Sequence, residues 1–287
     1  MKSVGIIGCG WIFQSEHLLG YLATKNGYIK GFFDVDTALA EKAKAAYLDG
    51  LEKSNNGTAI LTIVKKETKV YKDYNELIKD VELIDICTPP VYHTFYAKLA
   101  AEAKKGILCE KPFARSYWDA KETIDSIKKS RSSFYMFTQV IYNDIFKYGK
   151  KLIDDGVIGD IIRVKNAHAT KDLDHTVSNK NFWNPMVSGG GALADIGPHA
   201  YSVQKYWIGE KYRLKSVKDN GIETRITRRD IQGEDSDVKV EDIARIELEW
   251  ESQGKTIKGE IEAYWGDNPY KFGLYHEIEG TKGIMKF

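Results

Sequence analysis

The chain has 287 residues, of which 43% are hydrophobic and 29% charged, and its 42 Lys and Arg residues nearly balance its 41 Asp and Glu residues. The resulting net charge of +1 gives no support for electrostatic binding to nucleic acid. No apolar run approaches the ~20 residues that span a membrane, and a chain of this length can bury a core for one large domain or two ordinary ones.

The first half of the sequence alternates short β-prone runs with amphipathic stretches. Continuous apolar strands that alternate with helices are typical of a parallel sheet covered on both faces. Thr37 is a candidate N-cap for the second predicted helix. The predicted strands are residues 4–7, 29–33, 83–87, 107–109 and 134–138, and the predicted helices are residues 11–23, 37–47, 73–80, 92–104 and 117–129.

Residues 50–69 interrupt this alternation, because only a short connection is expected there. The stretch contains its own β-prone run at residues 59–64. We therefore predict a small surface hairpin or flap.

The second half has a different pattern. A predicted helix at 145–154 and a strand at 161–169 are followed by a polar loop with Trp183 and a helix at 191–208. Residues 243–250, 256–265 and 272–279 are predicted as strands without intervening helices, which favours an antiparallel sheet with one covered face. We therefore predict an α/β protein of two domains: a doubly wound parallel sheet in residues 1–139, and an α+β domain with a large, mainly antiparallel open sheet in residues 140–287.

A glycine-rich turn follows the first predicted strand and opens the first helix. It consists of Gly8, Cys9, Gly10, Trp11 and Ile12. Such a turn lets backbone N–H groups approach a pyrophosphate at the N-terminus of a helix. The alternative is a tight turn without a ligand, but the order of strand, turn, helix and second strand favours a dinucleotide site.

Asp34 ends the second predicted strand, where an acidic residue binds the ribose hydroxyls of a dinucleotide. A carboxylate repels a 2′-phosphate, and Val35, Asp36 and Thr37 offer no basic group, so NAD is favoured over NADP. The alternative role for Asp34 is to cap the following helix. Phe13 occupies the place of the usual third glycine and should push that helix away from the strand.

Two further strands are predicted to end in polar, proline-containing segments at the ligand-binding edge of the sheet. Thr88 and Pro89 follow one strand, and His93 lies just beyond them. Lys111 follows the other, where it could donate to a substrate oxygen, and Pro112 could adopt the cis form. Taken alone, His93 is an ordinary helix residue and Lys111 an ordinary surface lysine.

Asp195 and His199 stand four residues apart in the glycine-rich segment 189–199. On one helix they share a face, and a carboxylate beside an imidazole fixes its tautomer and supports its protonated form. That arrangement suits a general acid or base. Pro198 should bend the helix near this pair. Taken alone, the pair is also compatible with a surface ion pair.

These segments together resemble the Gfo/Idh/MocA family of NAD(P)-dependent sugar and inositol oxidoreductases. The matching segments are GIIGCGWI, FFDVD, ICTPPVYH, CEKPF, GGGALADIGPH, VEDIA and EGTKG, which span nearly the whole chain. The resemblance implies a Rossmann domain and the catalytic trio Lys111, Asp195 and His199. It further implies that the cofactor is bound by Gly8, Cys9, Gly10, Trp11, Ile12, Asp34, Thr88, Pro89, His93, Glu110 and Lys111, and the substrate by Lys111, Tyr142, Trp183, Asp195 and His199.

The resemblance implies hydride transfer between the nicotinamide and a hydroxyl-bearing carbon of a sugar, inositol or related substrate. His199 would take the hydroxyl proton, Lys111 would donate to the same oxygen, and Asp195 would orient His199. Two alternatives remain open: a reductase of a non-sugar cyclic substrate, and an NAD-sensing regulator without catalysis. Asn184 and Ser202 depart from residues frequent in the family near the substrate, so the substrate's identity stays open.

The cysteines and histidines bear on compartment and metal. The three cysteines are widely spaced, which favours the reducing cytoplasm over a disulfide framework, and the six histidines show no paired-ligand spacing, so no metal is expected. The outer face of the antiparallel sheet, if apolar, should pair subunits into a homodimer or homotetramer, with Phe272, Leu274 and Tyr275 as candidates. The EGTKG segment lies close to the last residue, which suggests a compact member or a missing C-terminal piece.

Overall fold

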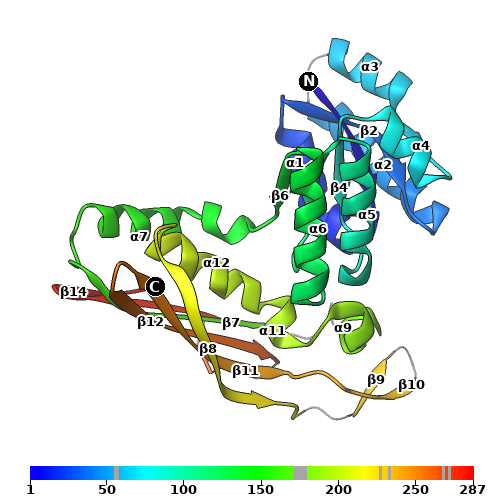
Figure 1. Cartoon of the computed structure of the whole chain (residues 1–287). Helices are drawn as coiled ribbons and strands as arrows, with labels where there is room; N and C mark the ends of the chain where they lie inside the picture. The colour runs from blue at the N-terminus through cyan, green and yellow to red at the C-terminus, as the bar shows by residue number, and fades with distance from the viewer. Residues whose placement is uncertain (55–57, 171–179, 226–227, 232–233, 267–268, 271–272) are drawn as a thin grey trace. The chain divides into compact units, whose positions relative to one another are not determined.

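The computed structural model describes residues 1–54, 58–170, 180–225, 228–231, 234–266, 269–270 and 273–287. These residues form two compact units, Met1–Phe137 and Thr138–Phe287, each with its own sheet and core (Figure 1). Within the described ranges, no helix is both long enough and apolar enough to cross a membrane.

The first unit is built on a six-stranded parallel sheet in the order β3-β2-β1-β4-β5-β6, which confirms the predicted parallel sheet and adds the short strand β3 to the five predicted strands. This is the strand order of a Rossmann fold. Its strands are β1 (Lys2–Ile7), β2 (Gly27–Phe33), β3 (Lys69–Val70), β4 (Leu83–Ile86), β5 (Gly106–Cys109) and β6 (Phe134–Met136), and its helices are η1 (Phe13–His17), α1 (Leu18–Ala23), α2 (Thr37–Lys53), α3 (Thr58–Glu67), α4 (Tyr74–Asp80), α5 (Pro90–Glu102) and α6 (Tyr117–Ser130).

The two faces of this sheet bury separate hydrophobic clusters. Successive residues of a strand point to opposite faces, so Ile84 and Ile86 of β4 pack with α5 and α6, whereas Cys87 packs with the cluster around α2. Asp85 lies between these isoleucines and is fully buried. A carboxylate therefore enters the interior of the unit on the face that η1 and α2 cover.

Two local predictions for the first unit are wrong. Residues 58–67 form helix α3, not a hairpin: Leu61 and Val64, three residues apart, pack into the cluster around α2, so burial of one helical face overrides the β-prone composition. The N-cap of α2 is Asp36, whose carboxylate accepts the backbone N–H of Ala38; Thr37 is the first residue of the helix.

The second unit contains a six-stranded, mainly antiparallel sheet in the order β14-β13-β7-β12-β11-β8, in which only β7 and β12 pair in parallel. Its strands are β7 (Ile161–Thr170), β8 (Arg213–Glu223), β11 (Ile243–Ser252), β12 (Lys255–Trp265), β13 (Leu274–Gly280) and β14 (Gly283–Lys286), with a separate hairpin of β9 (Arg228–Ile231) and β10 (Glu234–Asp237). The helices are η2 (Gln139–Tyr142), α7 (Asp144–Asp154), α9 (Lys180–Trp183), α10 (Pro185–Ser188), α11 (Ala192–Asp195) and α12 (Gly197–Ile208).

Helices α7 and α12 cover one face of this sheet, where Trp207 and Trp250 form the core with Ile261 (Figure 1). The single helix predicted for residues 191–208 is in fact two, α11 and α12, which meet at Ile196. Pro198 lies in the first turn of α12, where its missing N–H and fixed φ are tolerated, so the proline begins a new helix instead of bending a longer one.

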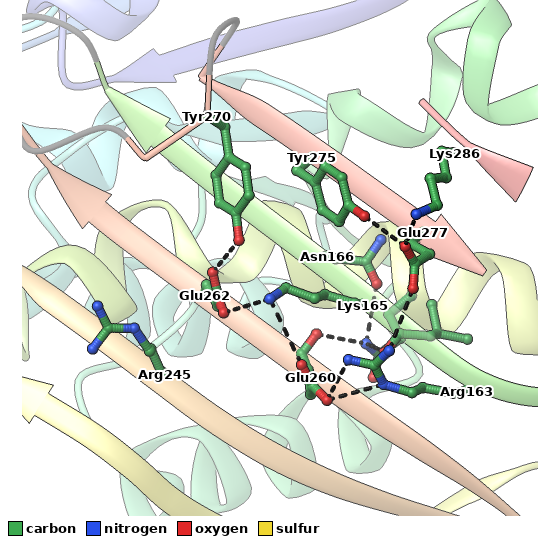
Figure 2. Close-up of polar contacts among 12 residues, drawn as sticks. Arg163, Lys165, Asn166, Arg245, Glu260, Glu262, Tyr270, Tyr275, Glu277 and Lys286 are labelled. Atoms are coloured by element: carbon green, nitrogen blue, oxygen red, sulfur yellow. Dashed lines mark hydrogen bonds and ion pairs between the residues drawn. The ribbon is translucent and has the colours of Figure 1, made fainter. Parts of the chain in front are cut away.

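The opposite face of the sheet carries charged and phenolic side chains (Figure 2). Arg163 donates to Glu260 from Nη2 at 2.7 Å and from Nε at 3.0 Å, and Lys165 pairs with Glu262 at 2.8 Å. The rings of Tyr270 and Tyr275 stack at 5.0 Å. The conditional expectation of an apolar outer face is therefore not met at these described positions.

Of the two described residues proposed for that face, Tyr275 lies on it and Leu274 does not. Leu274 precedes Tyr275 in β13 and so points to the opposite side of the sheet, which is also the side of His276. Phe272 lies outside the described residues.

Candidate functional site

The glycine turn brings the ends of β1 and β4 into close contact. Gly8 has φ of +91°, and a Cβ there would lie 2.7 Å from the carbonyl carbon of Cys87. Only glycine fits both the conformation and the space. Gly10 has open space around it, with no atom within 4 Å of a built Cβ among those described. The turn thus leaves its backbone accessible at the second glycine, as close approach of a pyrophosphate requires.

Asp34 lies beside this turn and is held by two backbone donors. Its carboxylate accepts the N–H of Cys9 at 2.7 Å and the N–H of Asp36 at 2.9 Å. The N-cap of α2 is Asp36, so the alternative prediction that Asp34 caps this helix is wrong. A carboxylate has about four acceptor positions, so Asp34 retains capacity for ribose hydroxyls.

Phe13 is accommodated where the third glycine of the motif is usual. It is fully buried and meets the ring of Phe32 edge-on at 5.7 Å. The residues from Phe13 to His17 form a π-helical turn, which is wider than an α-helical turn and coincides with this bulky side chain. Just before this turn, Trp11 is exposed and Ile12 is half-buried, so two apolar side chains lie near solvent next to the glycine turn.

His93 is buried behind the ends of β4 and β5. Its Nε2 lies 2.6 Å from the carbonyl oxygen of Thr88, and its Nδ1 lies 2.8 Å from the carbonyl oxygen of Pro112. The side chain is 0% exposed. Burial lowers the pKa of His93, so the neutral ring carries one N–H and donates to one of these two carbonyl oxygens. Thr88 and Pro89 are half-buried at the edge of the sheet.

Glu110 is also buried, and it contacts a second histidine. Its Oε1 lies 2.8 Å from Nε2 of His17, and its Oε2 accepts the backbone N–H of Lys111 at 2.9 Å. On the other side of the ring, His17 Nδ1 lies 2.9 Å from Oδ2 of Asp85, which also accepts the Tyr21 hydroxyl. An imidazole is thus enclosed between two buried carboxylates.

The charge state of His17 follows from this enclosure. Burial alone would lower the pKa of the imidazole, but the Cys87 sulfur and the Asp85 carboxylate beside it outweigh burial and raise that pKa well above its ordinary value. Because a carboxylate oxygen also lies opposite each ring nitrogen, the geometry and the direction of this shift both favour an imidazolium ion whose two ring nitrogens donate.

His17, Asp85 and Cys87 are also spaced as metal ligands could be, with potential ligand atoms within 4.8 Å of one another. Each imidazole nitrogen, however, already lies within hydrogen-bonding distance of a carboxylate. A metal would have to replace the proton that joins His17 to Asp85. We therefore treat the cluster as a hydrogen-bonded charge cluster.

Lys111 lies between Glu110 and Pro112, the two residues that these buried histidines contact. It is half-buried, its backbone N–H is bonded to Glu110, and the peptide bond to Pro112 is cis. Glu110 Oε1 contacts His17, and the Pro112 carbonyl oxygen lies 2.8 Å from His93 Nδ1, so a buried imidazole contacts the residue on either side of Lys111.

In the second unit, the glycine-rich segment is organised by Glu241. The Glu241 carboxylate accepts the N–H groups of Gly191 and Leu193, each at 2.9 Å, and its carbonyl accepts the N–H of Ala192. A Cβ on Gly191 would lie 1.8 Å from that carbonyl oxygen. Glu241 therefore satisfies the first N–H groups of α11, the helix that ends at Asp195.

Asp195 and His199 lie in different helices, on either side of Ile196. The Asp195 carboxylate accepts the indole N–H of Trp265 at 3.1 Å. The orientation of His199 by Asp195 remains a prediction.

The His199 ring stacks on that of His168 at 5.7 Å. His168 in turn meets His276 edge-on at 5.1 Å, and Asn166 donates to His276 Nδ1 at 2.8 Å. Gln204 donates to the Asn166 side chain at 3.0 Å. The His168 ring, on which His199 stacks, therefore packs against a buried network of hydrogen bonds among His276, Asn166 and Gln204.

The remaining predicted substrate residues differ in exposure. Tyr142 is exposed at the end of η2, whereas Trp183 is buried in α9 against Trp265 at 5.3 Å. The two departures from the family have local structural roles: Asn184 caps α10 by accepting the N–H of Met186, and the Ser202 hydroxyl donates to the Pro198 carbonyl.

Sequence reasoning placed the glycine turn, Asp34, Thr88 and Lys111 at the ends of neighbouring strands, and the parallel sheet brings these ends to one edge. It missed His17, Asp85, Glu241 and His168. Asp85 carried a signal, because a charged residue within the apolar run LIDI needs a buried partner. The partners of the others lie far away in the sequence and left no such signal.

Comparison with known families identifies both units. Residues 2–137 match the oxidoreductase family with an NAD-binding Rossmann fold, and residues 146–286 match the GFO/IDH/MocA C-terminal domain. The levoglucosan dehydrogenase of Pseudarthrobacter phenanthrenivorans is 26% identical over 305 residues, which cover 99% of this chain and 73% of that protein. The glucose-6-phosphate 3-dehydrogenase of Bacillus subtilis is 26% identical over 86% of this chain and 63% of its own length.

Solved structures agree with this relation. The levoglucosan dehydrogenase in complex with NADH and levoglucosan has a TM-score of 0.81 and 25% identity, and the match covers 100% of this chain and 73% of that one. The chain therefore spans about three quarters of the length of that relative. The two family models follow one another along the chain, and this chain belongs to the Gfo/Idh/MocA family of NAD-binding oxidoreductases, which the sequence resemblance implied.

Proposed function

We propose that this enzyme transfers a hydride between NAD and a hydroxyl-bearing carbon of a sugar, an inositol or a related polyol. Relatives named for levoglucosan, glucose 6-phosphate and myo-inositol support this substrate class. In this proposal residues 1–139 bind the cofactor, and residues 140–287 bind substrate and form contacts between subunits. Bound NAD supplies the ring that accepts the hydride.

The observation that carries the proposal is that each group needed for the chemistry lies on an anchored segment. Lys111 follows Glu110, whose carboxylate is bonded to the buried His17, and precedes Pro112, whose carbonyl oxygen lies 2.8 Å from the buried His93 ring. His199 lies against His168, and Asp195 is bonded to Trp265. Fixed donors and bases lower a barrier because they are oriented before the reaction begins.

We assign one role to each of these three groups. His199 accepts the substrate hydroxyl proton as general base, and returns it to the carbonyl in the reverse direction. Lys111 donates a hydrogen bond to the same oxygen and stabilises its developing negative charge. Asp195 orients His199. Atoms and electrons balance in this step, because the hydroxyl loses its proton to the imidazole while the carbon loses its hydride to NAD.

The proposed cofactor is NAD in preference to NADP. The half-buried Asp34 carboxylate can accept from a 2′-hydroxyl, and it would repel a 2′-phosphate. The following residues Val35 and Asp36 are exposed and supply no positive charge. The three free, buried cysteines suit a reducing compartment, and we propose the cytoplasm.

A panel of sugars, inositols and sugar acids tests the proposal through NADH absorbance, with NAD and NADP compared at each substrate. Lys111→Ala and His199→Ala should each lower kcat by about 100-fold or more, because each removes a group that acts in the transition state. The affinity for NADH, measured by fluorescence, should stay nearly unchanged. Wild-type turnover in either variant would contradict the assigned roles, and NADH binding without turnover on the panel would favour the sensor.

We also propose that two or four copies associate through the open face of the second sheet. Arg163 and Lys165 alternate there with Glu260 and Glu262, so a facing copy would meet both signs of charge (Figure 2). Charged rows of this kind set register more than they add affinity. A monomeric mass by light scattering at micromolar concentration would overturn the proposal.

A further inference from the structure

The strongest unexplained feature of the first unit is its buried charge cluster. His17, Asp85 and Glu110 are each less than a tenth exposed, and one imidazolium joins the two carboxylates at 2.8 and 2.9 Å. Burying three ionisable groups costs free energy unless every hydrogen-bonding atom is matched. An apolar set of the same size could fill the space, so the cluster calls for a role beyond packing.

The cluster joins two segments that the proposed reaction uses. His17 ends η1, the turn that follows the glycine loop, and Glu110 immediately precedes Lys111. The two residues are 93 positions apart in the chain but share one hydrogen bond. The cluster thereby connects the cofactor-binding loop to the backbone of Lys111.

The connection to Lys111 is direct. The Glu110 carboxylate accepts from His17 with one oxygen and from the Lys111 backbone N–H with the other. If His17 were uncharged or absent, this carboxylate would lose its buried donor and could turn toward solvent or take up a proton. The N–H of Lys111 would then lose its fixed acceptor.

We propose that His17 is a positioning residue of the reaction, which holds the Glu110 carboxylate and through it the backbone that carries Lys111. This inference rests on the proposed function, because it assumes that Lys111 donates to the substrate. The groups that face His17 are Asp85 in β4, Cys87 directly after β4, Glu110 directly after β5, and the Phe137 ring, whose centroid lies 4.4 Å from that of the imidazole.

The test compares two substitutions in the same cluster. His17→Gln removes the imidazolium that joins the carboxylates, whereas Tyr21→Phe removes only a hydroxyl that donates to Asp85 Oδ2 and makes no hydrogen bond to Glu110 among those described. Each deletes buried hydrogen bonding, so each should lower the free energy of unfolding. Only the first breaks the link to Lys111.

His17→Gln should lower kcat roughly 10- to 100-fold, since a displacement of about 1 Å costs that much. The dissociation constant of NADH should change by less than about 3-fold, under 1 kcal/mol. Tyr21→Phe should leave kcat within about 3-fold of wild type. Equal loss of kcat in both variants, or wild-type kcat in His17→Gln, would show a purely structural cluster.

Two spectroscopic readings need no substrate and separate this inference from the proposed function. In the ¹⁵N spectrum of the wild-type protein at pH 8.5, both His17 ring nitrogens should be protonated; a neutral ring would overturn the inference even if the variant failed to fold. In protein with ¹³C-methylated lysines, the Lys111 resonance, assigned with Lys111→Arg, should move in His17→Gln and not in Tyr21→Phe. An unmoved resonance would contradict the positioning role even if the enzyme reduces NAD with polyols.

Discussion

The two sheets of this protein place their ionisable side chains in opposite ways. In the first unit an imidazolium and two carboxylates lie in the interior, beside a sheet covered on both faces. In the second, Arg163 and Lys165 lie with their acidic partners on a face that the helices leave open. Interior charges must be matched atom by atom, whereas charges on an open face have water as an alternative partner. Substitutions should therefore differ sharply in cost between the two sheets.

The largest effect is expected for Asp85→Ala. The substitution leaves the His17 charge with one carboxylate instead of two and leaves the Tyr21 hydroxyl without its acceptor. Unfolding by urea should show a loss of about 3–5 kcal/mol, the cost of breaking a buried ion pair on one side. Asp85→Asn is the matched control and should lose less, because its amide oxygen still accepts. A loss below about 1 kcal/mol would show that the buried cluster contributes no more stability than an exposed ion pair.

An intermediate effect is expected from His276 in the covered face of the second sheet. Burial, and after it the neighbouring His168, lowers the pKa of His276 to about 3. The unfolded chain has a value of about 6.5, so between pH 6.5 and 3 it binds a proton that the folded chain does not. The stability that His276 contributes is therefore lost as the pH falls, by up to about 1.4 kcal/mol per pH unit.

His276→Gln tests this dependence, because glutamine can accept from Asn166 but does not titrate. The variant should lose stability at pH 7 and then show a flatter decline toward pH 4 than the wild type. Urea unfolding at several pH values measures both slopes. Parallel slopes in the two proteins would assign the acid sensitivity to other groups.

The smallest effect is expected for Lys165→Ala on the open face. Lys165 pairs with Glu262 and lies 3.8 Å from Glu260. Glu260 also pairs with Arg163, so it keeps a positive partner when Lys165 is removed. The loss of stability should be about 0.2–1 kcal/mol and should shrink in high salt. A larger loss that grows on dilution of the protein would show that a second copy covers this face and that the comparison between sheets holds only for the monomer.

The parallel sheet and the residues at its edge were predictable because the information is local. Each strand is a short apolar run, each turn has its own glycine or proline, and parallel strands bring their ends to one edge. The same reasoning failed for residues 58–67, where β-branched residues form a helix because burial of Leu61 and Val64 decides the outcome.

The partners of the site residues were less predictable. His17 and Glu110, or Gly191 and Glu241, meet only after the fold has formed, and no spacing in the sequence marks such pairs. Open faces are equally hard to predict. Alternation along a strand shows which residues share a side, but not which side is open. Leu274 and Tyr275 are neighbours in β13 and therefore lie on opposite sides of the sheet.

The bond between Glu241 and the glycine-rich segment has a consequence for how the chain acquires its structure. During synthesis Gly191 is made well before the carboxylate that satisfies its N–H, 50 positions later. Helix α11 has only four residues and is too short to persist alone. The segment bearing Asp195 should therefore stay unorganised in the nascent chain until Glu241 has emerged, and catalytic competence would arise among the last events of folding.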